Sequence, residues 1–247
     1  MFCQKCGKKL SFFTGLFKSI CDDCSKSNNT SSNVVETRNQ ETISNVGGEI
    51  EYFGLKDWWL NELTPEERQT IITVYNPFGF DKRSLYQGKI EFSTQTTTGF
   101  LTGLLSWFRK PEYQTISVKI IKRLNSIPKK SMSIEDEHFF YQMQIETYYR
   151  NRESDKTALA SAVEACKQQI SISSAAKRTF LSKYPSSPLP SHVGYTQLCI
   201  ILEKQQLYDE VIDLAQKAKK QGWNGEWDKR IERCMKKKIK SKSEKKD

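Results

Sequence analysis

The chain has 247 residues, of which 37% are hydrophobic and 28% are charged. This length fits one large domain or two modest ones, and 12 glycines and 7 prolines exclude collagen-like and low-complexity fibrous proteins. The best candidate for a membrane span, residues 99–108, has about half the length that a bilayer requires. No secretory leader opens the chain, so we expect a soluble cytoplasmic protein with no membrane partner.

The positive charge is concentrated at the two ends of the chain. Lysine and arginine together number 39 and the acidic residues 29, which gives a net charge of +10. Residues 229–247 carry a net charge of +7 and residues 1–26 a net charge of +3, so the body between them is neutral. This pattern argues against a nucleic-acid-binding surface that extends over the whole fold.

Four cysteines near the N-terminus have the spacing of metal ligands. Cys3 and Cys6 form one Cys-x2-Cys pair, and Cys21 and Cys24 form a second pair after fourteen intervening residues. Two such turns supply the four thiolates of a tetrahedral Zn²⁺ site, and four cysteine ligands leave no position open for a catalytic water. The alternative is a disulfide or a redox pair. A disulfide is disfavoured because the cytosol keeps thiols reduced, and a redox site is disfavoured because it uses one Cys-x2-Cys motif and not two. We therefore expect one structural Zn²⁺.

Residues 1–26 resemble the small zinc-ribbon and zinc-knuckle modules at the N-termini of many bacterial proteins. This resemblance covers about a tenth of the chain and names no binding partner. The other cysteines, Cys166, Cys199 and Cys234, fall at apolar positions of predicted helices, where a free cysteine is usually a small buried hydrophobe.

The composition divides the next part of the chain into a linker and a small helical unit. Residues 27–48 are rich in Ser, Asn and Thr, which predicts a flexible linker, with a poorly coded strand as the alternative. Residues 49–110 predict a small, mainly helical subdomain. It has a helix that starts with a capping box of Thr64 and Glu67, and a short buried helix over residues 99–108.

Two further features of this subdomain guide the interpretation. Pro65 follows the capping threonine at the first helical position, where proline is favoured. The adjacent Trp58 and Trp59 could form a binding site, but large aromatic residues more often seal the core of a small helical unit. We expect both tryptophans to be core residues.

From residue 112 onward, apolar residues recur at helical spacing, as Ile116, Ile120 and Leu124 illustrate. The predicted helices cover residues 112–127, 136–150, 157–170 and 174–184, a pair of helices within 194–222, and a last helix over 227–239. The expected fold is therefore mainly α, with a helical-repeat region over residues 111–239.

Residues 194–222 look like a tetratricopeptide repeat, which is a hairpin of two antiparallel helices. The matching core positions are Leu198, Cys199, Leu202, Tyr208, Val211, Ala215 and Ala218. Gln206 stands in the turn where the family usually has glycine. Residues 136–170 resemble a second, degenerate copy, with Tyr148 at the aromatic position and Ala162 at the small one. The resemblance covers about 90 residues and implies tetratricopeptide-like hairpins closed by a terminal helix.

Stacked hairpins of this family form a concave surface that binds peptides or protein segments. By this analogy, the exposed first-helix residues Thr196, Ile200, Glu203 and Lys204 would face the groove. The alternative is that two repeats only hold the body together, because a short array exposes little groove.

The sequence contains no arrangement typical of an active site. The two histidines, His138 and His192, lack a nucleophile or a metal ligand at catalytic spacing. No phosphate-binding glycine loop or nucleophile elbow is present either. The acidic run at residues 135–137 suits the first turn of a helix, where the dipole favours acids. We therefore expect no catalytic residue and no enzymatic activity.

Two functions fit these features. The first is a non-enzymatic adaptor that binds another protein through its helical-repeat body and carries a structural zinc module. The alternative is a nucleic-acid-associated factor that uses the zinc module and the C-terminal lysines, namely Lys236, Lys237, Lys238 and Lys240. Residues 240–247 are expected to be a basic disordered tail, which lacks the interleaved aromatic residues of a single-strand binder.

Overall fold

The computed structural model describes residues 46–78 and 81–243, and this part of the chain is mainly α-helical. Its extended pairing is an isolated bridge between Ser191 and Asn224. The expected zinc module, with Cys3, Cys6, Cys21 and Cys24, lies outside the described residues.

The α-helices of the described residues follow the predicted ranges closely, apart from the five-residue α3, which the sequence did not predict. They are α3 (Gly48–Tyr52), α4 (Pro65–Val74), α5 (Thr97–Trp107), α6 (Gln114–Asn125), α7 (Ile134–Arg150), α8 (Ala158–Ser171), α9 (Ser173–Lys183), α10 (Val193–Lys204), α11 (Tyr208–Gln221) and α12 (Trp227–Ser243). Short turns of other helix types connect them: η1 (Trp58–Glu62), η2 (Lys82–Leu85), η3 (Pro111–Tyr113) and η4 (Lys129–Ser131). No helix among the described residues is both long and apolar enough to cross a membrane.

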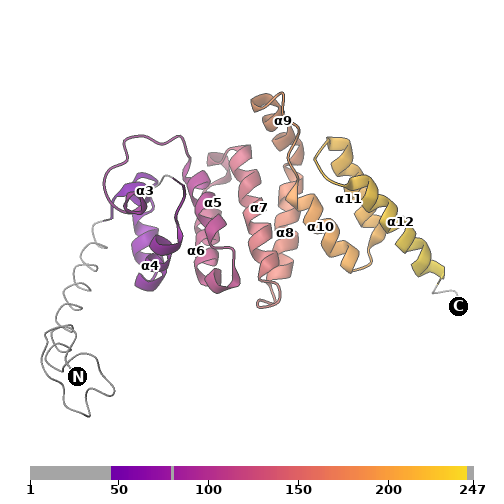
Figure 1. Ribbon diagram of the computed structural model, residues 1–247, viewed down its shortest axis with the longest axis horizontal. Helices are drawn as coiled ribbons and strands as arrows, with labels where there is room; N and C mark the ends of the chain where they lie inside the picture. The colour runs from indigo at the N-terminus through magenta and orange to yellow at the C-terminus, as the bar shows by residue number, and fades with distance from the viewer. Residues whose placement is uncertain (1–45, 79–80, 244–247) are drawn as a thin grey trace, which may run out of the picture.

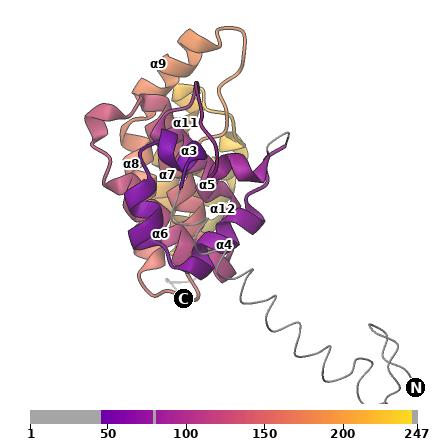
Figure 2. The same ribbon diagram turned by 90° about the vertical axis from the view of Figure 1, so that its left-hand side faces the viewer.

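The helices stand side by side in chain order, with α9 projecting beyond one end of its neighbours (Figure 1). Figure 2 views the same stack from its α3 end and again shows α9 standing clear of the other helices. In the second half, α7 packs on α8, α8 on α10, α10 on α11 and α11 on α12. Helix α10 also contacts α7, and α7 contacts α5. Each helix therefore packs mainly on near neighbours in the sequence.

The predicted start of α4 is confirmed. The Thr64 hydroxyl accepts a hydrogen bond from the Glu67 amide at 3.2 Å, and the Glu67 carboxylate accepts one from the Thr64 amide at 2.8 Å. The buried Arg68 then donates to the carbonyl oxygens of residues 59, 60 and 63, which fixes the preceding turn. Trp58 and Trp59 are 3% and 1% exposed, so both are core residues as predicted.

The body begins before the expected end of the linker. Val46 is buried in the first hydrophobic cluster, and Gly48 opens α3. The three residues from position 46 to position 48 therefore belong to the folded body, because the apolar Val46 side chain finds a core to pack in. The rest of the expected linker lies outside the described residues.

The apolar core consists of two clusters that divide within α7. The first cluster extends from Val46 to Phe140 and includes the buried face of α6. The second begins with Ile145 and extends to Cys234. Residue 110, the expected boundary between subdomain and repeats, lies inside the first cluster. A boundary at residue 110 would therefore divide one apolar cluster, because α6 follows this residue and buries Ile120 against the earlier helices.

Helices α10 and α11 are the pair of helices that the sequence predicted within residues 194–222, and they pack against each other. Six of the seven positions matched to the repeat are buried, namely Leu198, Cys199, Leu202, Val211, Ala215 and Ala218. The seventh, Tyr208, is partly buried against the same cluster. Gln206 has a φ of 60°, in the left-handed region, and the Leu207 amide donates to the Leu202 carbonyl at 3.0 Å. This is the C-terminal motif in which glycine is favoured, and Gln206 occupies the glycine position.

Helix α12 continues to Ser243, beyond the expected end at Ile239. The first residues of the expected disordered tail are therefore helical. Lysine is a good helix former, so a lysine-rich segment that follows a packed helix can prolong it.

Candidate interaction face

Helices α5, α7, α10 and α12 run parallel to one another. The start of α5 meets the start of α7, where Thr96 donates to Asp136 at 2.9 Å, and the end of α5 meets the end of α7, where Arg109 pairs with Glu146. The ends of α7 and α10 meet where Lys204 donates to the Tyr149 hydroxyl at 3.2 Å. We call the surface that these four helices expose between them the parallel face.

The first cleft on the parallel face lies between α5 and α7 and has a volume of about 290 Å³. Its lining residues are Gly99, Thr102, Gly103, Ser106, Asp136, Phe139 and Met143. Gly103 has no neighbouring atom within 4 Å of the position that a Cβ would take, so the α5 side of the cleft is open at this position. Phe139 is 39% exposed, which is a large fraction for an apolar ring. This cleft can therefore receive an apolar side chain.

The second cleft, of about 240 Å³, lies where the ends of α7 and α10 meet. Its lining residues are Tyr149, Arg152, Glu153, Leu159, Ile201, Lys204 and Gln205. The Arg152 guanidinium lies 4.2 Å from the centre of the Tyr149 ring, and Lys204 approaches the same ring from α10. The cleft thus places two cations around one aromatic ring.

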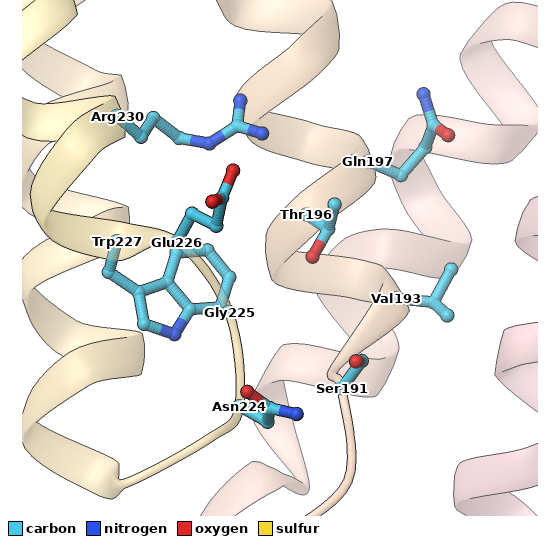
Figure 3. A pocket seen from close by; sticks show the side chains of 9 residues that line it. All are labelled: Ser191, Val193, Thr196, Gln197, Asn224, Gly225, Glu226, Trp227 and Arg230. Atoms are coloured by element: carbon cyan, nitrogen blue, oxygen red, sulfur yellow. The ribbon is translucent and has the colours of Figure 1, made fainter.

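The third cleft, of about 320 Å³, lies between α10 and α12 (Figure 3). Figure 3 shows Trp227, Glu226 and Arg230 on one side, Thr196 on the other, and Ser191 and Asn224 close together at one end. Val193, Gln197 and Gly225 complete the lining. Hydroxyl and amide groups dominate the α10 side, so this cleft can offer hydrogen bonds to a polar ligand.

The four residues expected to line a groove occupy different places. Thr196 lines the third cleft and Lys204 lines the second. Ile200 is half-buried on α10 and is not among the residues that line either of these clefts. The side chain of Glu203 is only 13% exposed because it pairs with Arg230 and Arg233 of α12. Glu203 thus holds α12 against α10 and does not present a free carboxylate.

A cleft of about 420 Å³ on another side of the stack has a polar lining that is engaged in its own hydrogen bonds. Lys129 donates to the Tyr141 hydroxyl at 2.8 Å, and this hydroxyl donates to Glu137 at 2.9 Å. Gln144 donates to Asn125 at 3.3 Å. These bonds would have to break before a polar ligand could bind there, so this cleft is a weaker candidate site.

The structure brings together two histidines that sequence reasoning left unconnected. The rings of His138 and His192 lie 5.1 Å apart, and both residues are at most 1% exposed. The indole of Trp223 stacks on His138 at 5.6 Å, and Phe180 contacts the same ring edge-on at 5.3 Å. Burial lowers the pKa of His138 to about 4. Burial, and then the charge of His138, lowers the pKa of His192 to about 3.

Both histidines are therefore neutral near pH 7, and their surroundings are structural. His192 is the N-cap of α10, where its Nδ1 accepts from the Tyr195 amide at 3.3 Å. Gln169 donates to the His138 carbonyl at 2.9 Å and accepts from the Gly194 amide at 2.6 Å. A Cβ at Gly194 would lie 2.8 Å from the Gln169 amide oxygen, so this close approach requires glycine. The histidines lie 54 positions apart, with no spacing in the sequence to link them.

The prediction that the internal cysteines are small buried hydrophobes is confirmed. Cys166, Cys199 and Cys234 are free thiols with no exposed surface. Burial raises the pKa of Cys166 to about 12 and that of Cys199 to about 11, so both are protonated at neutral pH. Residues 46–78 and 81–243 contain no cluster of three or more His, Cys, Asp or Glu side chains able to hold a metal ion.

Two of the C-terminal lysines pair with acids of the helical body. Lys236 pairs with Glu232 at 2.6 Å, one turn earlier on α12, and Lys238 pairs with Asp209 of α11. Internal pairing of this kind reduces the charge that these two lysines can offer to a nucleic acid.

Comparisons with known proteins add no family to this description. No family model, no curated protein and no solved structure matches the chain.

Proposed function

We propose that this chain is a cytoplasmic, non-enzymatic adaptor that binds another protein along the parallel face. In this proposal Cys3, Cys6, Cys21 and Cys24 bind one structural Zn²⁺. The tetratricopeptide-like body positions the parallel helices whose clefts receive the partner.

The observation that carries the proposal is the series of clefts between successive parallel helices. One cleft lies between α5 and α7, the next lies among the ends of α7 and α10 and the start of α8, and the third lies between α10 and α12. A small metabolite would occupy one of them, whereas an extended protein segment can contact all three. Phe139 lines the first cleft with an exposed ring, and the half-buried Ile200 lies one turn after Thr196 of the third cleft, so both supply apolar surface on this face. Segments that bind repeat scaffolds use such long surfaces.

Site-specific photo-crosslinking tests the proposal directly. A benzophenone amino acid is placed at Phe139 or Ile200 on the parallel face, and at the exposed Lys217 of α11 as the matched control. We expect a discrete protein adduct from positions 139 and 200 in native lysate, unchanged by nuclease, and none from position 217. Equal adducts at all three positions, or adducts that nuclease removes, would contradict the adaptor function.

The second candidate function is nucleic-acid binding, which the net charge of +7 over residues 229–247 favours. Removing everything after Asp228 is a poor test, because α12 buries Cys234 against the body. The variant Lys236→Gln, Lys237→Gln, Lys240→Gln keeps the helix and removes three charges. If these lysines contact phosphates, the slope of log K against log salt should fall by about 2–3 in this variant. An unchanged slope in an oligonucleotide anisotropy titration would exclude the lysines as the contact.

A further inference from the structure

The connection between α11 and α12 contains the single Asn-Gly pair of the chain, Asn224 and Gly225. In such a pair the backbone nitrogen of the glycine can attack the side-chain amide of the asparagine, because glycine has no Cβ to hinder the approach. The reaction has three requirements. The asparagine side chain must be free to turn, the nitrogen that follows it must not be held in a hydrogen bond, and water must reach both groups.

Asn224 meets all three requirements. Asn224 and Gly225 are both exposed, and Figure 3 shows the Asn224 side chain beside Ser191 at one end of the third cleft. The Asn224 backbone amide donates to the Pro190 carbonyl at 3.2 Å, which holds the main chain in place. Within residues 46–78 and 81–243, neither the Asn224 side-chain amide nor the Gly225 backbone nitrogen makes a hydrogen bond. The reacting groups are therefore free.

Three other asparagines of the described residues each fail a requirement. Asn61 donates to a carboxylate of the preceding turn at 2.6 Å, so its side chain is held. Asn76 precedes a proline, whose nitrogen has no proton to lose. Asn151 is buried and donates to a carbonyl of α7 at 2.8 Å.

Asn125 is the closest comparison to Asn224. It is exposed and is followed by a small residue, Ser126. The Ser126 amide, however, donates to the Lys122 carbonyl at 3.1 Å, so the attacking nitrogen is already engaged. The fold therefore separates two asparagines that the sequence alone would place close in reactivity.

The glycine of the pair is required by packing. A Cβ at Gly225 would lie 2.6 Å from a ring carbon of Trp227, which is closer than side chains approach. A larger residue that would slow the reaction therefore does not fit here. The reactive pair is a consequence of how α12 begins against its own tryptophan.

We propose that Asn224 is a site of spontaneous deamidation and isomerisation. The Gly225 nitrogen loses its proton and bonds to the side-chain carbonyl carbon of Asn224, and the bond from that carbon to Nδ2 breaks so that ammonia leaves. Water then opens the cyclic imide at either carbonyl, which gives aspartate or isoaspartate. Water is the only other reactant, and no oxidation or reduction takes place.

The isoaspartate product should loosen α12. It adds one carbon to the main chain between Trp223 and Trp227, which are both buried. The indole nitrogen of Trp227 also donates to the Trp223 carbonyl at 2.7 Å, so the segment is fixed at both ends. Close-packed interiors respond to a change of even one methylene, so the longer chain cannot keep both contacts and the bridge to Ser191. Aspartate adds only a carboxylate. This inference does not depend on the adaptor function.

Peptide mapping by mass spectrometry tests the reaction. The full chain is incubated at pH 8 either folded or unfolded in urea, and isoaspartate is labelled by an isoaspartyl methyltransferase. We expect folded and unfolded chains to lose Asn224 on the same time course, with isoaspartate exceeding aspartate. Asn125 should react in urea and stay intact in the folded chain. An intact Asn224 in the folded chain, or equal reaction at Asn125, would overturn the proposal.

Two variants test the effect on α12. The incubated parent should contain a fraction that unfolds at lower urea, followed by tryptophan fluorescence, and that grows with the isoaspartate content. Fresh Asn224→Asp supplies the charge without the extra carbon and should unfold like the fresh parent. Incubated Asn224→Gln, whose longer side chain disfavours ring closure, should not change. A parent that unfolds identically before and after conversion, or an equal loss in the Asn224→Gln variant, would refute the loosening of α12.

Discussion

The buried histidine pair predicts that the helical body loses stability on mild acidification. His138 and His192 lie among aromatic rings, and neither ring nitrogen of His138 has a hydrogen-bond partner. Protonating either ring would bury a positive charge with no opposite charge to pair with it, and this costs free energy. Unfolding releases both rings to water, where they accept protons readily. Lower pH therefore favours the unfolded chain.

The pKa values give the size of the effect. An unfolded histidine has a pKa of about 6.5, whereas the folded values here are about 4 for His138 and about 3 for His192. Because the folded pKa values are depressed, the full stability is present above pH 6.5 and declines as the pH falls toward 4. Linkage gives a loss of roughly 2 kcal/mol per histidine between pH 7 and pH 5, or about 4 kcal/mol for the pair. That is a large part of a typical free energy of unfolding.

Urea unfolding followed by tryptophan fluorescence at pH 7, 6 and 5 measures this loss. The comparison variant is His138→Phe, which keeps an aromatic ring in the cluster and leaves His192 as the N-cap of α10. Acidic residues titrate alike in both proteins, so the difference between their pH profiles reports His138. We expect the variant to lose about 2 kcal/mol less than the parent between pH 7 and pH 5. Equal losses in the two proteins would refute the assignment of a buried neutral His138.

Three further predictions concern substitutions at buried, strained or metal-ligand positions. Ala218→Glu should lower the free energy of unfolding by roughly 2–4 kcal/mol, because Ala218 is fully buried in α11, and an unchanged melting temperature would refute the repeat register. Gln206→Gly should stabilise the chain by about 1 kcal/mol in urea unfolding by relieving the positive φ, and a loss of stability would show that the Gln206 side chain contributes more than the strain costs. Cys3→Ser with Cys6→Ser should abolish zinc binding measured by metal analysis while the helical circular dichroism persists, because the linker predicted from the sequence would uncouple the two parts. Loss of the helical signal in that variant would contradict the uncoupling.

The helices were predictable because their signals are local. The capping box at Thr64 and the apolar stripe of α6 each act within one or two turns of the chain. The buried positions of α10 and α11 followed from spacing and from the resemblance of that segment to a repeat.

Long-range arrangements could not be read in the same way. The histidine pair depends on which helices become neighbours, and no local pattern encodes that choice. The core boundary was misplaced for the same reason, since only tertiary packing shows that α6 belongs with the earlier helices.

The division of the core within α7 determines how the body should unfold. Phe140 of this helix belongs to one apolar cluster and Ile145 to the other. Helix α7 therefore couples the stability of one half of the body to that of the other. In a stack held by nearest-neighbour contacts, cooperativity depends on the strength of such a shared interface. Amide hydrogen exchange should therefore find the slowest protons in α7. Weakening this helix would convert one unfolding transition into two, with the halves on either side melting independently.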